Sequence, residues 1–483
     1  MKAPVQGTPA VPRRSGLPVF FAATFGCFLG LSLLKFGNPP IMEKWTTPPT
    51  DIYEFLLGSP WPIGWAYRLL GCVAILGLFV ARRNEKVPRW LVLLPVAWLF
   101  WQLLATIRTV DARLSNPTLE HFVACVACFY LGLFALSRVE RMGWFWAGLI
   151  CGFMLVVIGG WQQHFGGLEA TRKYFYLYIY PKTKEIPPEY FKKLSSNRIF
   201  STLFYPNALA GALLLLLPAI LGGLWKARRF FTPAAGWFLA VLVAVPALAC
   251  LYWSGSKGGW LLMLGLAAIT FLRMPFNRRY KLILVGALLL LGGIGFAAKY
   301  AGFFQKGATS VVARFDYWRA ALQVATTRPL FGSGPGTFAI EYQQLKRPEA
   351  EMSRLVHNDY LEQASESGWP GFLLYAAFVA GALAWTAPRR LLSLSSESSP
   401  VSAPAIPVPP SDTQPEADWP VFSVWLGVLA WAVQSLFEFD LYLPALAWPA
   451  FTLLGWLVGR NKGCSLPAEA RPGSKPKSAT HQR

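Results

Sequence analysis

Long apolar runs recur along most of the chain, and polar connections of very different lengths separate them. A helix needs about 20 mostly apolar residues to cross the hydrocarbon core of a bilayer. Windows of that length predict about twelve spans, at residues 17–36, 62–81, 89–107, 119–137, 143–161, 203–224, 235–253, 258–274, 280–300, 368–387, 420–439 and 444–459. The predicted fold class is therefore an all-α polytopic membrane protein.

Composition supports this interpretation and excludes a soluble globular class. The 483 residues are 54% hydrophobic and only 14% charged, and the mean hydropathy is +0.39. So few charges would leave a soluble protein with too much apolar surface. The net charge of +21 does not indicate nucleic acid as a partner, because the cations gather in short connections, as the positive-inside rule requires. Membrane lipids are the expected surroundings.

These basic connections also predict the orientation and the domain layout. The connections at 82–86, 138–141, 226–229 and 273–281 fall on one side if the number of spans is even, which places both termini in the cytoplasm. The layout has a cytoplasmic N-terminus at 1–16, a transmembrane core at 17–387, a disordered cytoplasmic linker at 388–419, two last helices at 420–459 and a cytoplasmic tail at 460–483. The linker is rich in Ser and Pro and cannot bury a core. The first apolar run lacks a clear cleavage site and is expected to stay as a helix.

Two long loops are predicted on the opposite face, near 162–202 and 301–367. Both contain many Lys and Arg residues. A cationic surface beside the membrane suits an anionic ligand such as a phosphate or pyrophosphate head group. The need to keep the loops soluble explains the charge equally well. The choice between this explanation and an anionic ligand therefore depends on the motifs.

The most informative motif is His357-Asn358, followed by nine residues and then Gly368-Trp369-Pro370-Gly371. It joins a long polar loop to an apolar helix. A histidine at this boundary is a candidate general base, because its unperturbed pKa lies near 6.5. Glu362 and Glu366 on the same predicted helix either orient a substrate or keep the helix soluble.

Candidate anion-binding residues stand at other loop–helix boundaries. Arg198 and Asn207 bracket the start of an apolar helix, where Arg198 either clamps a phosphate or reaches toward lipid head groups, and Asn207 either supports it or caps the helix. Lys257 lies in a small-residue turn whose free N–H groups could form an anion nest. Arg314 and Arg319 lie on a predicted amphipathic surface helix and offer secondary contacts.

Two further classes of site are not expected. The glycine-rich segment 331–338 lacks the Lys-Ser/Thr ending of a phosphate-binding loop and predicts a structural turn. Pairs of metal ligands with recognisable spacing are missing, so we expect chemistry without a metal or a cofactor.

Four motifs in this order resemble the O-antigen ligase / O-antigen polymerase superfamily of bacterial membrane glycosyltransferases. They are R-x-x-x-T-x-x-x-P-N at Arg198–Asn207, S-[RK]-G at Ser256–Gly258, R-x-x-x-W followed by P-L-x-G-x-G-x-G-x-F at Arg314–Phe338, and the ligase-type H-[NSQ]-x9-G-x-x-G at His357–Gly371. The segment Phe437–Leu441 also resembles the family.

The resemblance covers roughly residues 170–456 and implies twelve spans with a large helical periplasmic loop between spans nine and ten. It implies transfer of a glycan from an undecaprenyl-pyrophosphate donor to an acceptor hydroxyl, on the periplasmic face of the bacterial inner membrane. In ligases the acceptor is a lipid A–core sugar, in polymerases it is the growing glycan, and in related oligosaccharyltransferases it is a protein side chain. The complete His motif favours the ligase.

The resemblance also implies the role of each motif residue. His357 corresponds to the base that activates the acceptor, with Asn358 and Asn207 in support. Arg198 and Lys257 correspond to positions that bind the pyrophosphate and help it leave. The family usually has arginine where this chain has Lys257. Lysine keeps the positive charge but lacks the two parallel donors of a guanidinium. Arg314 or Arg319 could therefore take the place of the family's arginine.

The implied enzyme is an inverting, metal-independent glycosyltransferase. A transporter or flippase is the main alternative from another class, because twelve spans are common among transporters. Transporters, however, place ionisable residues near the membrane midplane and have related halves, and neither feature is evident in the sequence. A non-enzymatic scaffold would have no need for these clustered motifs.

Overall fold

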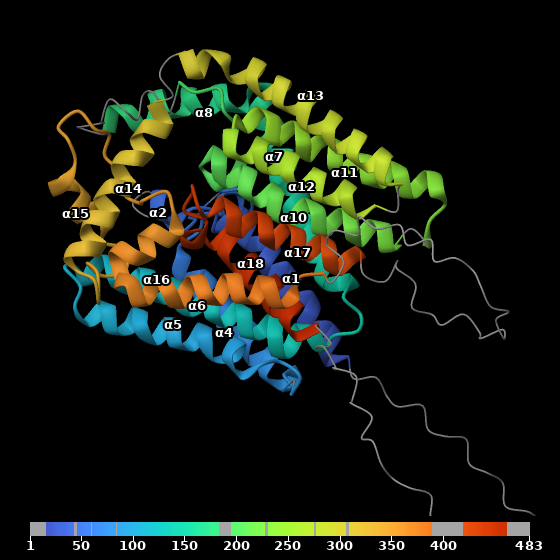
Figure 1. Cartoon of the computed structure of the whole chain (residues 1–483), viewed down its shortest axis with the longest axis horizontal. Coiled ribbons are helices and arrows are strands. Elements are labelled where there is room, and N and C mark those ends of the chain that lie inside the picture. Colours follow the sequence, from blue (N-terminus) through green and yellow to red (C-terminus); the bar gives the residue numbers. More distant parts are fainter. Residues whose placement is uncertain are drawn as a thin grey trace, which may run out of the picture.

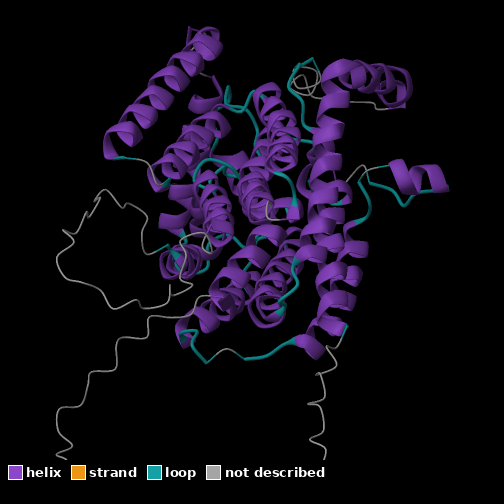
Figure 2. Cartoon of the chain, turned by 90° about the vertical axis from the view of Figure 1, so that its right-hand side faces the viewer, coloured by secondary structure: helices purple, strands orange, loops and turns teal. Residues whose placement is uncertain are grey.

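The computed structural model describes residues 16–42, 46–58, 60–83, 85–182, 195–227, 230–274, 277–305, 309–388 and 419–460. The predicted linker, most of the N-terminal and C-terminal tails and part of the first long loop lie outside these residues. Within the described part every regular element is helical, as Figure 2 shows. The predicted all-α class is confirmed.

The first half of the chain forms a run of helices that are joined mostly by short connections. They are α1 (Leu17–Lys35), α2 (Pro39–Met42), α3 (Ile52–Leu57), α4 (Ile63–Val80), α5 (Arg89–Ile107), α6 (Ala112–Tyr130), η2 (Leu131–Ala135), η3 (Leu136–Arg138), α7 (Gly143–Gln162), η4 (Gln163–Gly167), α8 (Leu168–Tyr174), η5 (Phe175–Ile179), η6 (Tyr180–Lys182) and η7 (Ser201–Leu203).

The second half contains the remaining long helices and the short α15. They are α10 (Pro206–Ala227), α11 (Pro233–Ser254), α12 (Lys257–Arg273), α13 (Arg278–Gln305), α14 (Thr309–Thr327), α15 (Phe338–Leu345), α16 (Asp359–Thr386), α17 (Trp419–Gln434), η10 (Asp440–Tyr442) and α18 (Pro444–Arg460). Figure 1 shows α5, α6 and α16 on one side of α18, with α10 to α13 on the other.

Each of the twelve predicted spans coincides with a helix, but the count of twelve crossings is not confirmed. Nine helical stretches in the described residues are long and apolar enough to cross a membrane. The three other predicted spans form α12, α17 and α18, which have 17, 16 and 17 residues. The chain is thus a multi-pass membrane protein with about nine candidate spans.

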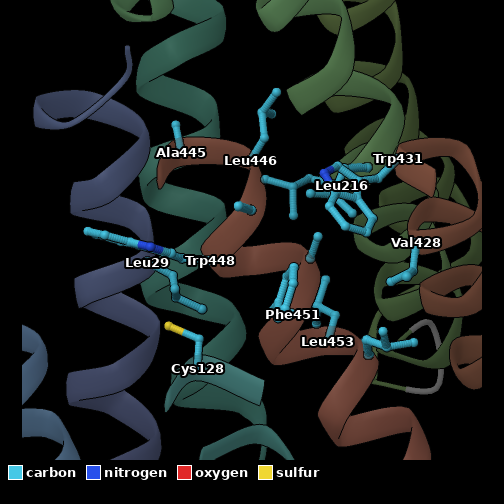
Figure 3. Close-up of a cluster of buried hydrophobic side chains, with 14 of the residues drawn as sticks. Leu29, Cys128, Leu216, Val428, Trp431, Ala445, Leu446, Trp448, Phe451 and Leu453 are labelled. Carbon is cyan, nitrogen blue, oxygen red and sulfur yellow. The ribbon is translucent and has the colours of Figure 1, made fainter. Parts of the chain in front are cut away.

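Helix α18 forms the centre of the bundle. Every residue from Pro444 to Gly459 is buried, and the helix packs against α1, α6, α10, α16 and α17. Figure 3 shows Trp448 and Phe451 projecting from this helix into the core. The Trp448 ring stacks on Phe28 of α1 at a centroid distance of 5.5 Å. An apolar helix that is covered on all sides is typical of the interior of a large bundle.

Glycines allow α1 and α7 to approach until their backbones touch. Gly26 and Gly30 on α1 face Gly148 and Gly152 on α7, each pair spaced four residues apart. A Cβ atom at Gly152 would lie 2.4 Å from the Cα and the carbonyl oxygen of Gly30. Small residues at this spacing are the usual means by which membrane helices pack closely.

Helix α16 begins nine residues before the predicted span. The Asn358 side chain caps it by accepting a hydrogen bond from the Leu361 backbone N–H at 3.0 Å. A kink at Gly368 (φ 70°, ψ −179°) then separates this polar first part from the apolar part. A Cβ atom there would lie 2.2 Å from the Leu330 carbonyl oxygen. Glycine is therefore required at this position both by its conformation and by the contact with the loop after α14.

Helices α14 and α15 occupy the long connection between α13 and α16. The predicted amphipathic surface helix around Arg314 is α14, whose buried face consists of Tyr317, Ala320, Ala321, Val324 and Ala325. Of these, Tyr317, Ala320 and Ala321 form a small core of their own with Phe338 and Tyr342 of α15. The connection therefore contains packed helices, while the side of the membrane on which it lies remains a prediction.

Candidate active site

His357 lies in the last turn of the connection that leads into α16. Its backbone has φ 57°, in the left-handed region that only a small share of non-glycine residues adopt. The Trp318 indole N–H on α14 donates to the His357 carbonyl oxygen at 3.4 Å. Strained backbone of this kind concentrates at functional sites, and here the imidazole contacts Glu438 and Phe439 in the connection between α17 and α18.

Aromatic rings enclose the His357 imidazole. The Phe439 ring meets it edge-on at a centroid distance of 4.8 Å, and the Tyr317 ring is stacked at 5.7 Å with an interplanar angle of 25°. The Tyr205 ring lies at 6.1 Å. About 20% of the side chain remains accessible, so the histidine is held in place but can be reached by another molecule.

The partner of the imidazole is the carboxylate of Glu438, in the connection between α17 and α18. His357 Nδ1 lies 3.3 Å from Glu438 Oε2, and the Glu438 side chain is only 4% exposed. The Tyr205 hydroxyl donates to the same oxygen at 3.0 Å. A proton on Nδ1 that is shared with the carboxylate leaves Nε2 with its lone pair free, which is the tautomer that a general base needs.

The second oxygen of Glu438 accepts hydrogen bonds from Arg314 Nη2 and from Asn207 Nδ2, the latter at 2.6 Å. Burial by itself raises the pKa of Glu438. The Arg314 guanidinium and the hydrogen bonds from His357 and Tyr205 outweigh this effect and lower the net pKa below its usual value. The carboxylate therefore stays ionised beside the imidazole.

Arg198 joins the same network through Asn207. Its Nη2 donates to Asn207 Oδ1 at 2.6 Å, and its Nε donates to the Ser254 carbonyl oxygen at the end of α11 at 2.7 Å. Asn207 therefore bridges Arg198 and Glu438 and does not cap α10. We refer to these connected side chains as the Glu438 network, whose members are Glu438, His357, Tyr205, Asn207, Arg198 and Arg314.

Lys257 lies next to this network but forms no hydrogen bond with it. It is the first residue of α12, directly after Ser256, whose hydroxyl caps the helix at Gly259. Its Nζ lies 3.8 Å from the ring centroid of Phe303 and 5.3 Å from that of Tyr300. Burial, together with the positive charges of Arg198 and Arg314, lowers the pKa of Lys257 to about 8. A concentration of positive charge that lowers a lysine pKa is suited to an anion.

Arg319 is not brought together with the other candidates. It is exposed on α14 and follows Arg314 by five residues, which turns it about 140° around the helix. No hydrogen bond or ion pair joins it to the Glu438 network within the residues that the structure describes. Asn358 contributes only as the helix cap that fixes the position of the neighbouring His357.

Of the two interpretations of Glu362 and Glu366, that of keeping the helix soluble is wrong, because both side chains are fully buried. Glu366 accepts hydrogen bonds from the Tyr442 hydroxyl at 2.7 Å and from the Phe338 backbone N–H at 3.2 Å. The glycine-rich segment before Phe338 wraps around this carboxylate, and the Gly334 N–H donates to the Glu366 carbonyl oxygen at 2.8 Å. The segment is thus the structural turn that the sequence predicts.

Glu438 and Tyr205 were not among the predicted site residues. Glu438 follows His357 by 81 residues, so sequence spacing cannot pair them. The one signal in the sequence that pointed to Glu438 was the family-like segment around Phe437. An acidic residue between two phenylalanines, directly before an apolar helix, is expected to be buried and so to need a partner. Tyr205 is a residue of the Arg198–Asn207 motif, between its threonine and its proline.

Part of the chain resembles a known protein family. Residues 242–376 match the model of the O-antigen ligase family. The matched part includes Lys257, Arg314 and His357, while Arg198 and Glu438 lie outside it.

A protein of Haemophilus influenzae (strain Rd), described only as uncharacterized, is 28% identical over 159 residues. The match covers 28% of this chain and 39% of the length of that relative. Over residues 242–376, the chain is therefore similar to the O-antigen ligase family of polytopic membrane proteins.

Proposed function

We propose that the protein transfers a glycan from an undecaprenyl-pyrophosphate donor to a lipid A–core hydroxyl, as an O-antigen ligase on the periplasmic face of the bacterial inner membrane. The observation that carries this proposal is the pairing of His357 Nδ1 with the buried Glu438 carboxylate. The pairing supports a base at His357, with the cations Arg198, Lys257 and Arg314 nearby. The match of residues 242–376 to the O-antigen ligase family supports the choice of a lipid-linked glycan as substrate.

His357 is the general base in this proposal. Its Nε2 accepts the proton of the acceptor hydroxyl while the oxygen attacks the anomeric carbon of the donor. The resulting imidazolium carries its second proton on Nδ1, where the ionised Glu438 stabilises it. Attack from the face opposite the leaving group inverts the configuration at the anomeric carbon.

The cations stabilise the leaving group. As the bond between the anomeric carbon and the phosphate oxygen breaks, the electron pair leaves with undecaprenyl pyrophosphate. Arg198, Lys257 and Arg314 offset the negative charge that develops there. Of these, Lys257 is the one without a hydrogen-bonded partner within the described residues, so its ammonium group can turn to the ligand. These side chains supply the charge that a metal ion provides in other transferases, and we propose a reaction that chelators do not inhibit.

Polymerisation of the glycan and transfer to a protein hydroxyl would use the same base and the same cations with a different acceptor. A transporter is less well supported, because the Glu438 network joins helix ends and loops, whereas transport sites lie near the midplane of the membrane.

The test is to delete the gene and restore it with the wild type, His357→Ala or His164→Ala. His164 is an exposed histidine that stacks on Trp253 and is not among the hydrogen-bond partners of Glu438 in the described residues, so it serves as the control. Surface lipopolysaccharide and lipid-linked glycan are compared by gel electrophoresis and mass spectrometry, with protein levels in the membrane matched.

A ligase predicts long lipid-linked glycan that accumulates without its acceptor in the deletion and in His357→Ala, and normal lipopolysaccharide with His164→Ala. Single unpolymerised repeats would identify a polymerase instead. Full transfer by His357→Ala at normal protein levels would show that the histidine is not the base.

A further inference from the structure

A cavity of about 860 Å³ lies at the end of the bundle opposite the Glu438 network. The first turn of α1, the end of α4 and the connection between η3 and α7 surround it. Helix α1 runs from this cavity to the other end of the bundle, where the Leu33 carbonyl oxygen accepts a hydrogen bond from Thr202 at 2.7 Å. The cavity therefore has no part in the proposed active site.

One wall of the cavity is basic. Arg82, Arg138 and Arg141 line it, against the single carboxylate of Glu140. Backbone contacts fix this wall, because the Arg82 N–H donates to the Phe134 carbonyl oxygen at 2.9 Å. Arg138 Nη2 also donates to the Arg83 carbonyl oxygen at 3.0 Å. Three exposed arginines border one space, and guanidinium groups are well suited to bind a phosphate.

The other wall of the cavity is apolar and open at its edge. Phe20, Phe79 and Trp144 line it and are 58%, 74% and 64% exposed. These side chains continue into the apolar surfaces of α1, α4 and α7, which lie among lipid chains in a membrane. A free phosphate ion would contact the arginines and make no use of this wall.

We propose that the cavity binds an anionic glycerophospholipid, with its phosphate between the arginines and its acyl chains along α1, α4 and α7. Basic pockets between helices on the positively charged side of a membrane protein recognise such head groups. Tryptophans such as Trp144 are enriched at the level of the lipid head groups. The bound lipid would hold the ends of three helices together at a point where protein side chains leave a gap.

The experiment measures lipid retention by the full-length protein with native mass spectrometry, using phosphatidylglycerol and phosphatidylcholine as probes. The wild type is expected to retain phosphatidylglycerol preferentially. In Arg82→Gln/Arg141→Gln this preference falls by about thirtyfold, from two lost arginine–phosphate contacts near the membrane surface. The matched control is Arg278→Gln/Arg279→Gln, which removes two exposed arginines at the start of α13, away from the cavity, and should leave the preference unchanged.

Equal preference in the two double variants, or no preference in the wild type, would overturn the proposal. If the double variant does not fold, Arg141→Glu alone replaces it, because that side chain is exposed, and the same loss of preference is expected. A second measurement compares the rise in Tm caused by phosphatidylglycerol with that caused by inorganic phosphate. An equal rise with phosphate alone would identify a free anion as the ligand and contradict the assignment to a lipid.

Discussion

The Glu438 carboxylate contacts an imidazole, a tyrosine, an amide and a guanidinium with only two oxygen atoms. The position of Glu438 explains why its carboxylate must be both ionised and buried. An ionised carboxylate keeps the proton on Nδ1 of His357, and burial strengthens that interaction by excluding water. In the proposed reaction, the reactivity of the histidine thus depends on Glu438, which does not itself take part in the proton transfer from the acceptor.

Replacing this carboxylate with an amide tests the dependence. Glu438→Gln keeps the size of the side chain but removes the charge that stabilises the His357 imidazolium, so the rate constant kcat should fall about 100-fold. The KM for the acceptor should change little. Transfer by purified protein in proteoliposomes, at several concentrations of donor and acceptor, measures both quantities.

Asp440→Asn is the control for that variant. Burial raises the pKa of the Asp440 carboxyl well above its usual range, and the charges of Asp359 and Glu438 add to the effect. Its neutral form is therefore favoured, and the amide changes its charge little. A loss of kcat in Asp440→Asn as large as that in Glu438→Gln would contradict a specific role for Glu438.

Lys257 predicts a pH dependence of donor use. Its lowered pKa of about 8 means that the free enzyme carries this charge below pH 8 and loses it above. The ratio kcat/KM for the donor should therefore decline between pH 7 and pH 9, because this ratio reports the titration of the free enzyme.

Lys257→Arg provides the comparison, because a guanidinium remains charged throughout this range. Its profile should stay level up to pH 9, with activity measured over short times to exclude inactivation. Parallel declines in the wild type and Lys257→Arg would assign the titration to another group.

At the scale of the element, apolar run length predicts where the helices lie, and capping residues determine where they begin. Each predicted span overlaps a helix of the structure. Helix α6, however, begins at Ala112, seven residues before the predicted start, because Asp111 caps it through the Arg113 N–H at 2.8 Å. Hydropathy cannot detect such a start, since the added turns are polar. The same reason explains the early start of α16 at Asn358.

The contact between α1 and α7 predicts a large effect of a small substitution. In Gly152→Val the new side chain would clash with the Gly30 backbone, so the two helices must separate. We expect Tm in detergent to fall by about 5 °C or more. Gly71→Val in α4 is the control, because a Cβ atom there meets nothing within 4 Å. Equal Tm values for the two variants would show that the close contact contributes nothing to stability.

At the scale of the whole molecule, the network forms because several helix ends meet on one side of the bundle. The start of α10, the end of α11, the start of α16 and the connection before α18 all contribute to it. Sequence reasoning placed His357, Arg198 and Lys257 at loop–helix boundaries of the same side, and the structure brings them close together. It could not predict the hydrogen bonds among them, because these depend on how segments distant in sequence pack.

The orientation of the bundle can be tested with single cysteines. Glu349 in the connection before α16 and Arg279 at the start of α13 are both exposed, and they are predicted to lie on opposite sides of the membrane. In intact cells, a membrane-impermeant maleimide should label Glu349→Cys, whereas Arg279→Cys should react only after lysis. The unsubstituted chain, with its native cysteines, gives the background. The reverse labelling pattern would place the active site in the cytoplasm.

The complete enclosure of α18 has a consequence for biosynthesis. This helix is the last described one to leave the ribosome, yet its neighbours surround it on every side. The earlier helices can enter the membrane before α18 does. They must then either leave the central position open or move apart when α18 is inserted. Because Glu438 lies directly before α18, the charge beside His357 also arrives at that last step. The nascent chain should therefore be catalytically silent until the bundle closes, which protects the lipid-linked donor from an enzyme that is only partly assembled.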